Sequence, residues 1–234
     1  MSFIDKNWKE MLNEKFKEKS RDEIWKKIRK DILDKFPDTQ FQPEEKNIFN
    51  VFEMLRSEIK VVILGQDPYP TPGDAMGYAF AVKKEIKEIP KSLKLIKNVI
   101  EEKFGLANYS EPWQTLKHWR DSGVFLLNTA LTIGKNKDSH LGFWRNFTKR
   151  KKGFTNKVIE YISETSEKYP CIWMLWGREA KKFKETIKKI NDKNYILEAP
   201  HPAVRDNSFC ECVYYNFLDA NKILNELYEK GIEW

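Results

Sequence analysis

The sequence predicts an α/β fold, arranged as a single-domain three-layer α/β/α structure around a central, mainly four-stranded parallel sheet. Four short apolar runs rich in β-branched or aromatic residues are typical of buried strands, and they lie at 61–64, 124–127, 171–176 and 195–197. Helical patterns separate these runs, at 91–104, 154–168 and 178–190. Because strands that alternate with helices need crossover connections, the strands should be parallel and covered on both faces.

The first part of the chain predicts two amphipathic helices within residues 4–35. Apolar positions recur there at helical spacing among many charges, at Trp8, Met11, Leu12, Phe16, Ile24, Trp25, Ile28 and Ile32. We expect these helices to cover the core. Pro37 and Pro43 end the pattern, and a short helix over residues 48–55 should follow.

The size of the chain indicates one domain over residues 1–234, with residues 1–35 as a helical extension packed on it. A chain of 234 residues with 41% hydrophobic content can bury one good core. No run of eighteen apolar residues occurs, and the first residues lack the apolar stretch of a secretory signal. We therefore expect a soluble, cytoplasmic protein without a membrane partner, and a monomer by default.

Charge and cysteine content constrain partners only loosely. Forty-two Lys and Arg against thirty-five Asp and Glu give a net charge of +7, which is compatible with a polyanionic partner but does not establish one. The basic run at 149–152 is typical of a solvated turn. Cys171, Cys210 and Cys212 are odd in number and lack metal-site spacing, so the sequence predicts neither a metal nor a disulfide scaffold.

Polar residues follow each predicted strand. Open parallel sheets bind ligands beyond the carboxyl ends of their strands, so these positions are where a site should lie. They are 65–70 after the first run, 128–129 after the second, 177–178 after the third and 200–202 after the fourth. The sequence thus brings an acid (Asp67), an amide (Asn128) and an imidazole (His201) to one edge of the sheet.

These segments resemble uracil-DNA glycosylases. Gly-Gln-Asp-Pro-Tyr at 65–69 is similar to the water-activating loop of that family, and other family-like segments follow in the family's order, at 77–80, 89–93, 123–132, 175–177 and 201–202. The resemblance covers roughly residues 36–228. It implies a monofunctional hydrolase that flips uracil out of DNA and cleaves its N-glycosidic bond, leaving an abasic site, with no cofactor and no metal. DNA, single- or double-stranded, is the implied partner, and a proteinaceous inhibitor is a second one to consider.

Two catalytic roles are carried by the resemblance. Asp67 would orient the attacking water and stabilise the oxocarbenium-like sugar, whereas by itself it could be an Asx-turn residue before Pro68. His201 would donate to uracil O2 and stabilise the anionic leaving group as a neutral imidazole, whereas by itself it could be a loop or core histidine.

The resemblance also assigns four substrate-binding residues. Asn128 would pair with the Watson–Crick edge of uracil, although an Asn at a strand end could instead cap the next turn. Phe80 would stack on the flipped base, and Tyr69 would exclude the thymine methyl group. Each aromatic alone is more often a core residue. Gln66 would shape the pocket floor through its backbone.

Four residues are candidates for DNA contact. They are Pro68, Ser92, Ser139 and Arg205, the last at the position where the family inserts a leucine into the base stack. Both serines could equally be helix caps.

Three departures from the family's pattern bear on DNA binding. Pro70 replaces a histidine, and residues 74–76 read Asp-Ala-Met where Gln-Ala-His is usual. Residues 203–206 read Ala-Val-Arg-Asp in place of Ser-Pro-Leu-Ser, which removes a phosphate-binding hydroxyl and adds a repelling carboxylate. Extra basic sequence lies within 145–153. These departures predict weakened binding of duplex DNA, with binding of single-stranded DNA less affected.

Two other functions stay open at this stage. One is a weakly active or non-catalytic DNA-binding relative, against which the retention of Asp67, Asn128 and His201 argues. The other is a glycosylase for another modified pyrimidine, against which Tyr69 and Asn128 argue.

Overall fold

The computed structural model describes residues 8–16, 20–105, 112–148, 151–164, 170–202 and 208–234. Within them, a four-stranded sheet forms the centre of the molecule, in the order β3-β2-β7-β8. Its strands are β2 (Val61–Gly65), β3 (Val124–Asn128), β7 (Ile172–Trp176) and β8 (Tyr195–Ala199). All three pairings are parallel, which confirms the predicted fold class.

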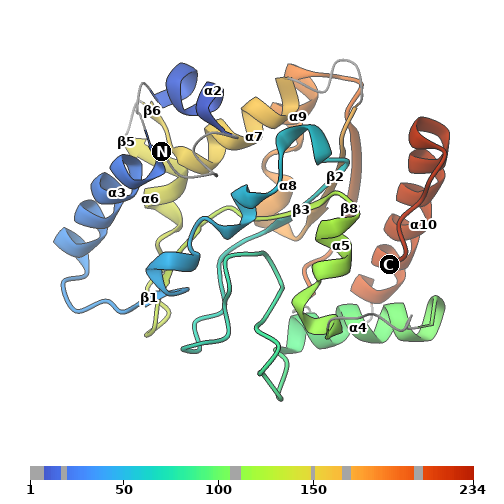
Figure 1. Cartoon of the computed structure of the whole chain (residues 1–234), viewed down its shortest axis with the longest axis horizontal. Helices are drawn as coiled ribbons and strands as arrows, with labels where there is room; N and C mark the ends of the chain where they lie inside the picture. Colours follow the sequence, from blue (N-terminus) through green and yellow to red (C-terminus); the bar gives the residue numbers. More distant parts are fainter. Residues whose placement is uncertain (1–7, 17–19, 106–111, 149–150, 165–169, 203–207) are drawn as a thin grey trace.

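Helices flank the sheet on both sides (Figure 1). On one side α4 (Lys91–Lys103) packs against α10 (Ser208–Tyr228), which also contacts β8, and α5 (Lys117–Asp121) contacts β3. On the other side α7 (Phe154–Glu164) packs against α9 (Lys184–Ile190). The predicted helix at 178–190 is split, because α8 (Arg178–Lys181) ends before α9 begins. The end of the helix predicted at 154–168 lies outside the described residues.

The N-terminal segment covers the core as predicted. It consists of α2 (Lys9–Met11), a π-helical turn (Leu12–Phe16) and α3 (Arg21–Lys35). The side chain of Ser20 caps α3 by accepting a hydrogen bond from the backbone N–H of Glu23. Trp8 is buried, and its indole N–H lies 3.0 Å from the carbonyl oxygen of Phe52.

The prediction of one short α-helix at residues 48–55 is wrong. The chain there forms 3₁₀ turns at Glu45–Asn47, Asn50–Glu53 and Arg56–Glu58. Phe49 and Phe52 are buried nevertheless, so their spacing reflects packing against the core rather than an α-helix. A further 3₁₀ turn lies at Trp113–Thr115.

Two small antiparallel pairs complete the secondary structure. β1 (Phe41–Gln42) pairs with β4 (Ile133–Gly134), and β5 (Asn146–Thr148), which follows α6 (Leu141–Arg145), pairs with β6 (Lys151–Lys152). The described parts of the extra basic sequence therefore pair as two short strands, and residues 149–150 of the basic run predicted as a turn lie outside the described residues. No helix in the described part of the chain is long and apolar enough to cross a membrane.

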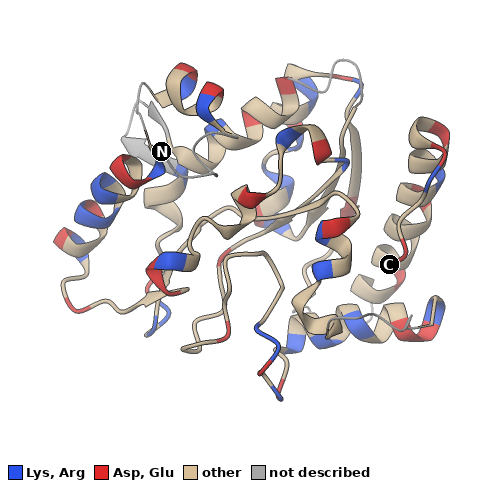
Figure 2. Cartoon of the chain, in the orientation of Figure 1, with Lys and Arg blue, Asp and Glu red and all other residues tan. Residues whose placement is uncertain are grey.

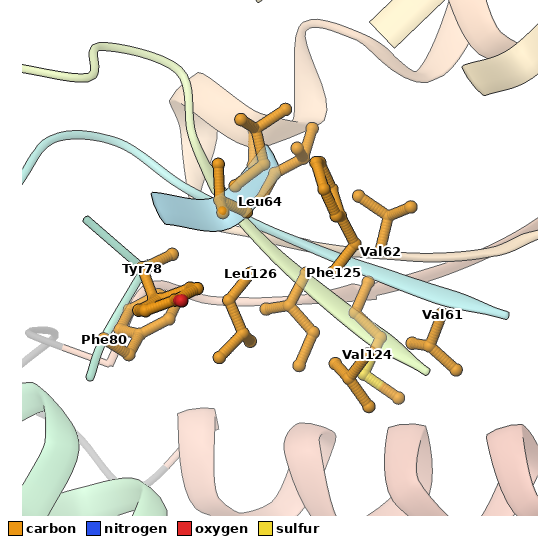
Figure 3. Packing of buried hydrophobic residues seen from close by; sticks show 14 of the residues in the cluster. Val61, Val62, Leu64, Tyr78, Phe80, Val124, Phe125 and Leu126 are labelled. Atoms are coloured by element: carbon orange, nitrogen blue, oxygen red, sulfur yellow. The ribbon is translucent and has the colours of Figure 1, made fainter. Parts of the chain in front are cut away.

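Three of the four strands of the sheet are fully buried, and β8 is mostly half-buried. All residues of β2, β3 and β7 are buried, and Figure 3 shows side chains of Val61, Val62, Val124 and Phe125 packed beside these strands. Each large apolar side chain buried in this way stabilises the fold by about 1.5–3 kcal/mol. The strand ends are consequently held on a rigid frame.

Candidate active site

The carboxyl edge of the sheet brings the predicted site residues together. Gly65 at the end of β2 lies opposite Asn128 at the end of β3, and Trp176 lies opposite Ala199. A cavity of about 930 Å³ opens at this edge. Its lining includes eight of the predicted residues, namely Gln66, Asp67, Pro68, Tyr69, Phe80, Ser92, Asn128 and His201.

Asp67 is a half-buried carboxylate in the loop after β2. The side-chain amide of Gln66 donates a hydrogen bond to its Oδ2 atom at 3.1 Å. Burial raises the pKa of Asp67 above its ordinary value, against the opposing effects of the Gln66 hydrogen bond and the nearby His201. Burial thus makes the ionised carboxylate less favourable than in water, and the Gln66 hydrogen bond and His201 offset this only in part.

His201 lies across from Asp67, two residues after β8. Burial lowers the pKa of its imidazole below the ordinary value, and the Asp67 charge only partly offsets that effect. The imidazole is therefore neutral at pH 7 and can donate one N–H. Gly177, at a φ of +88°, makes room for it, because a Cβ atom there would lie 2.8 Å from the Cβ atom of His201.

Asn128 is only 6% exposed, and it lines the cavity. The turn after β3 is closed by backbone bonds, from Thr129 N–H to Gly65 O at 2.9 Å and from Ala130 N–H to Gln66 O at 2.8 Å. Among the residues that the structure describes, no hydrogen bond makes the Asn128 carboxamide a cap of this turn. Its donors and acceptor are thus available to a ligand.

The backbone of Gln66 is fixed by the turn after β3. Besides the Ala130 N–H, its carbonyl oxygen accepts a hydrogen bond from the Thr129 hydroxyl at 3.0 Å. These bonds join the loops that follow β2 and β3. They fit the predicted role of Gln66 in shaping the floor of the cavity through its backbone.

Two aromatic residues form an apolar wall. The phenol of Tyr69 donates a hydrogen bond to the carbonyl oxygen of Phe80 at 3.0 Å, and its oxygen also lies 3.0 Å from the Ser92 hydroxyl. Phe80 adopts the left-handed backbone region, at a φ of +65°, and its ring lies 5.5 Å from that of Trp176. Figure 3 shows Phe80 next to Tyr78, beside Leu126 of β3.

The predicted DNA contacts fall into three groups. Pro68 and Ser92 line the cavity. Ser139 is exposed and is not among the lining residues; its hydroxyl accepts a hydrogen bond from the Leu141 N–H at 3.4 Å, as in the helix-cap alternative. Arg205 lies outside the described residues. As DNA contacts, all four stay predictions.

The structure places cations at the site to which the sequence assigned no role, among them Lys87 and Lys91 in the cavity lining. Lys137 lines the cavity itself. Arg178 lines a neighbouring hollow of about 610 Å³ together with Gln66 and His201, and its side chain is 91% exposed. Arg178 could have been found from its place directly after the third strand, whereas nothing in the sequence pattern marks Lys137. Figure 2 shows Lys and Arg mixed with acidic residues on α3 and α4, so charge alone does not mark the site.

The fold and the site together define an α/β enzyme whose carboxylate, carboxamide and neutral imidazole converge at the carboxyl edge of a parallel sheet. The model of the uracil DNA glycosylase superfamily matches residues 52–212. The chain belongs to the uracil-DNA glycosylase superfamily.

Individual relatives agree with this assignment. The chain is 35% identical over 240 residues to a uracil-DNA glycosylase of Fusobacterium nucleatum, covering 100% of this chain and 97% of the relative. It is 32% identical over 238 residues to one of Bacillus subtilis, covering 99% and 96%. The crystal structure of mimivirus uracil-DNA glycosylase has a similar fold, with a TM-score of 0.78 at 24% identity over 98% of this chain and 86% of that one.

Proposed function

We propose that this protein removes uracil from DNA, by turning the base into the cavity and hydrolysing its N-glycosidic bond to leave an abasic site. The observation that carries the proposal is that Asp67, Asn128 and His201, from three distant segments, line one cavity. Membership of the superfamily supports the reaction class.

The cavity chemistry matches the charges of this reaction. As the bond breaks, positive charge builds on the sugar and negative charge on the departing base. Asp67 supplies an anion for the sugar and an acceptor for the attacking water, since the Gln66 hydrogen bond occupies only Oδ2. His201 donates its N–H to the base oxygen that becomes negative, and as a neutral donor it needs no counter-ion.

Recognition of uracil follows from three side chains. The Asn128 carboxamide presents both a donor and an acceptor, which fit the N3–H and O4 of uracil but not the reversed pattern of cytosine. Phe80 stacks on the ring. Tyr69, which lies beside the Phe80 carbonyl and the Ser92 hydroxyl, fills the space that a thymine methyl group would need.

DNA binding draws on residues around the cavity. We assign phosphate contacts to Lys137 and Arg178, and we keep Pro68, Ser92, Ser139 and Arg205 as DNA contacts. We also keep the expectation that duplex binding is weakened and that binding of single-stranded DNA is less affected. A variant of mimivirus UNG has been crystallised in complex with UGI, and this structure aligns with the present chain at a TM-score of 0.77. An inhibitor protein is therefore a partner to test here. We further propose a monomeric, single-domain protein that acts in the cytoplasm.

The decisive experiment uses an oligonucleotide with one uracil, followed by alkaline cleavage at abasic sites. We expect the wild type to cleave it, Asp67→Asn to lose on the order of 10²–10⁴-fold in rate, and Asp219→Asn, an exposed change of the same kind on α10, to keep full activity. Asn128→Asp should admit cytosine.

The alternatives predict other outcomes. A wild type that binds this DNA without cleaving it would indicate a non-catalytic relative. Cleavage confined to C5-substituted pyrimidines would indicate another lesion. An unchanged rate in Asp67→Asn would overturn the assigned role.

A further inference from the structure

Ser92, Tyr69 and Phe80 form a chain of two hydrogen bonds across the cavity wall. Ser92 is the second residue of α4, Tyr69 lies in the loop after β2, and Phe80 precedes the isolated bridge residue Val82. The Tyr69 oxygen lies 3.0 Å from the Ser92 hydroxyl oxygen and 3.0 Å from the Phe80 carbonyl oxygen. Both contacts are within hydrogen-bond distance, so the phenol takes part in both at once.

Counting hydrogens fixes the direction of this chain. A tyrosine hydroxyl carries one hydrogen, and a carbonyl oxygen can only accept. The Tyr69 hydrogen is therefore donated to Phe80, and the bond between Tyr69 and Ser92 must use the hydrogen of Ser92. Since a serine hydroxyl also has a single hydrogen, Ser92 has none left to donate elsewhere.

A DNA phosphate would compete for that same hydrogen. Phosphate oxygens next to the cavity can only accept, so a contact with Ser92 requires its hydrogen to leave Tyr69. Tyr69 can then keep its bond to Ser92 only by donating to it, which leaves the Phe80 carbonyl without the phenol. Phe80 is held at a φ of +65°, a backbone region that is strained for a side chain with a Cβ atom.

We propose that Ser92 is a positioning residue whose single hydroxyl hydrogen couples contact with a DNA phosphate to the Tyr69–Phe80 wall of the base cavity. The inference rests on the proposed function for the identity of the polymer and the base. In the free protein, Ser92 donates its hydrogen to Tyr69, and Tyr69 donates its own to the Phe80 carbonyl. On DNA, Ser92 donates its hydrogen to the phosphate instead, and the Phe80 carbonyl loses its bond to the phenol.

The coupling predicts that loss of the Tyr69 hydroxyl strengthens DNA binding, which a Ser92–phosphate contact without coupling does not predict. Tyr69→Phe removes the acceptor that holds the Ser92 hydrogen and leaves the hydroxyl free for phosphate. Its affinity for a single-stranded oligonucleotide without uracil, measured by fluorescence anisotropy at fixed salt, should rise about 5-fold, the equivalent of one hydrogen bond. Adding Ser92→Ala should abolish the gain, whereas Ser92→Thr should retain it.

A second measurement uses a ligand that carries no phosphate. Free uracil should inhibit Ser92→Ala about 5-fold less well than the wild type, because the wall loses one of its hydrogen bonds. A serine that only touches phosphate leaves this inhibition constant unchanged. If Tyr69→Phe proves too unstable for the binding assay, this measurement decides alone.

Controls separate this inference from the proposed function. Tyr215→Phe, the same change at a side chain that is 54% exposed on α10, should bind the oligonucleotide like the wild type. A wild type that excises uracil, with no gain for folded Tyr69→Phe, overturns the coupling alone. A gain in Tyr69→Phe without uracil excision by the wild type supports the coupling and overturns the glycosylase proposal. No DNA binding by any variant overturns both.

Discussion

Gly65→Ala should disable the site without replacing any side chain that contacts the substrate. A Cβ atom at Gly65 would lie 2.2 Å from the Oδ1 atom of Asn128, whereas ordinary contacts begin at 3.4 Å. The carboxamide would therefore have to retreat by about 1.2 Å. Misplacement of a positioning group by about 1 Å can reduce a rate on the order of 10²-fold, and we expect a loss of that size in single-turnover excision of uracil.

Stability measurements test the cause of this loss. Overpacking a buried strand costs about 1–3 kcal/mol, which lowers Tm by roughly 2–12 °C in a chain of this size. Asn128→Ala added to Gly65→Ala removes the clashing oxygen and should restore part of the Tm without restoring activity. Gly142→Ala, where the new Cβ atom meets nothing within 4 Å, is the matched control and should keep both. A Gly65→Ala protein with wild-type rate would refute the requirement for the Asn128 position.

Three further predictions follow from the charges around the cavity. At pH 7 Asp67→Asn should raise Tm while it abolishes activity, because burial disfavours the ionised carboxylate of the wild type. This gain in Tm should shrink as the pH falls through the raised pKa of Asp67. A lower Tm for the variant than for the wild type at pH 7 would contradict this account. The rate should fall as the pH drops through the pKa of Asp67, which burial raises above 3.8, whereas His201, whose pKa burial lowers below 6.5, stays neutral above pH 6.5; a rate that stays constant down to pH 3.8 would contradict the role of the Asp67 carboxylate. Arg178→Ala should weaken DNA binding and reduce the slope of log affinity against log salt by about 1, and an unchanged slope would exclude a phosphate contact.

The sequence predicts the sheet better than the elements around it. Continuous apolar runs predict buried parallel strands because both faces of such strands are covered, and all four runs form strands. The break in the helix predicted at 178–190 has no comparable signal, because Phe183, which lies between α8 and α9, is buried and fits the apolar pattern of an unbroken helix. The buried pair Phe49 and Phe52 likewise has helical spacing without an α-helix.

The site residues follow from motif and strand order, but the contacts among them do not. That Asp67, Asn128 and His201 line one cavity is a consequence of parallel topology, which sequence patterning reveals. The bond between Ser92 and Tyr69 joins residues 23 positions apart through the packing of α4 against the loop after β2. Such a contact depends on the relative placement of two elements, on which local spacing carries no information.

Two glycines at strand ends explain how the polar groups can approach so closely. Gly65 ends β2 beside the Asn128 carboxamide, and Gly177 follows β7 beside the His201 ring. Any other residue at either position would place a Cβ atom within 2.8 Å of the neighbouring functional side chain. Since the strands are buried and cannot shift, the side chains would have to move instead. The geometry of the site therefore depends on the absence of Cβ atoms at these two glycines as much as on the polar groups themselves. For this reason a methyl group at Gly65 is expected to act like the loss of a catalytic side chain.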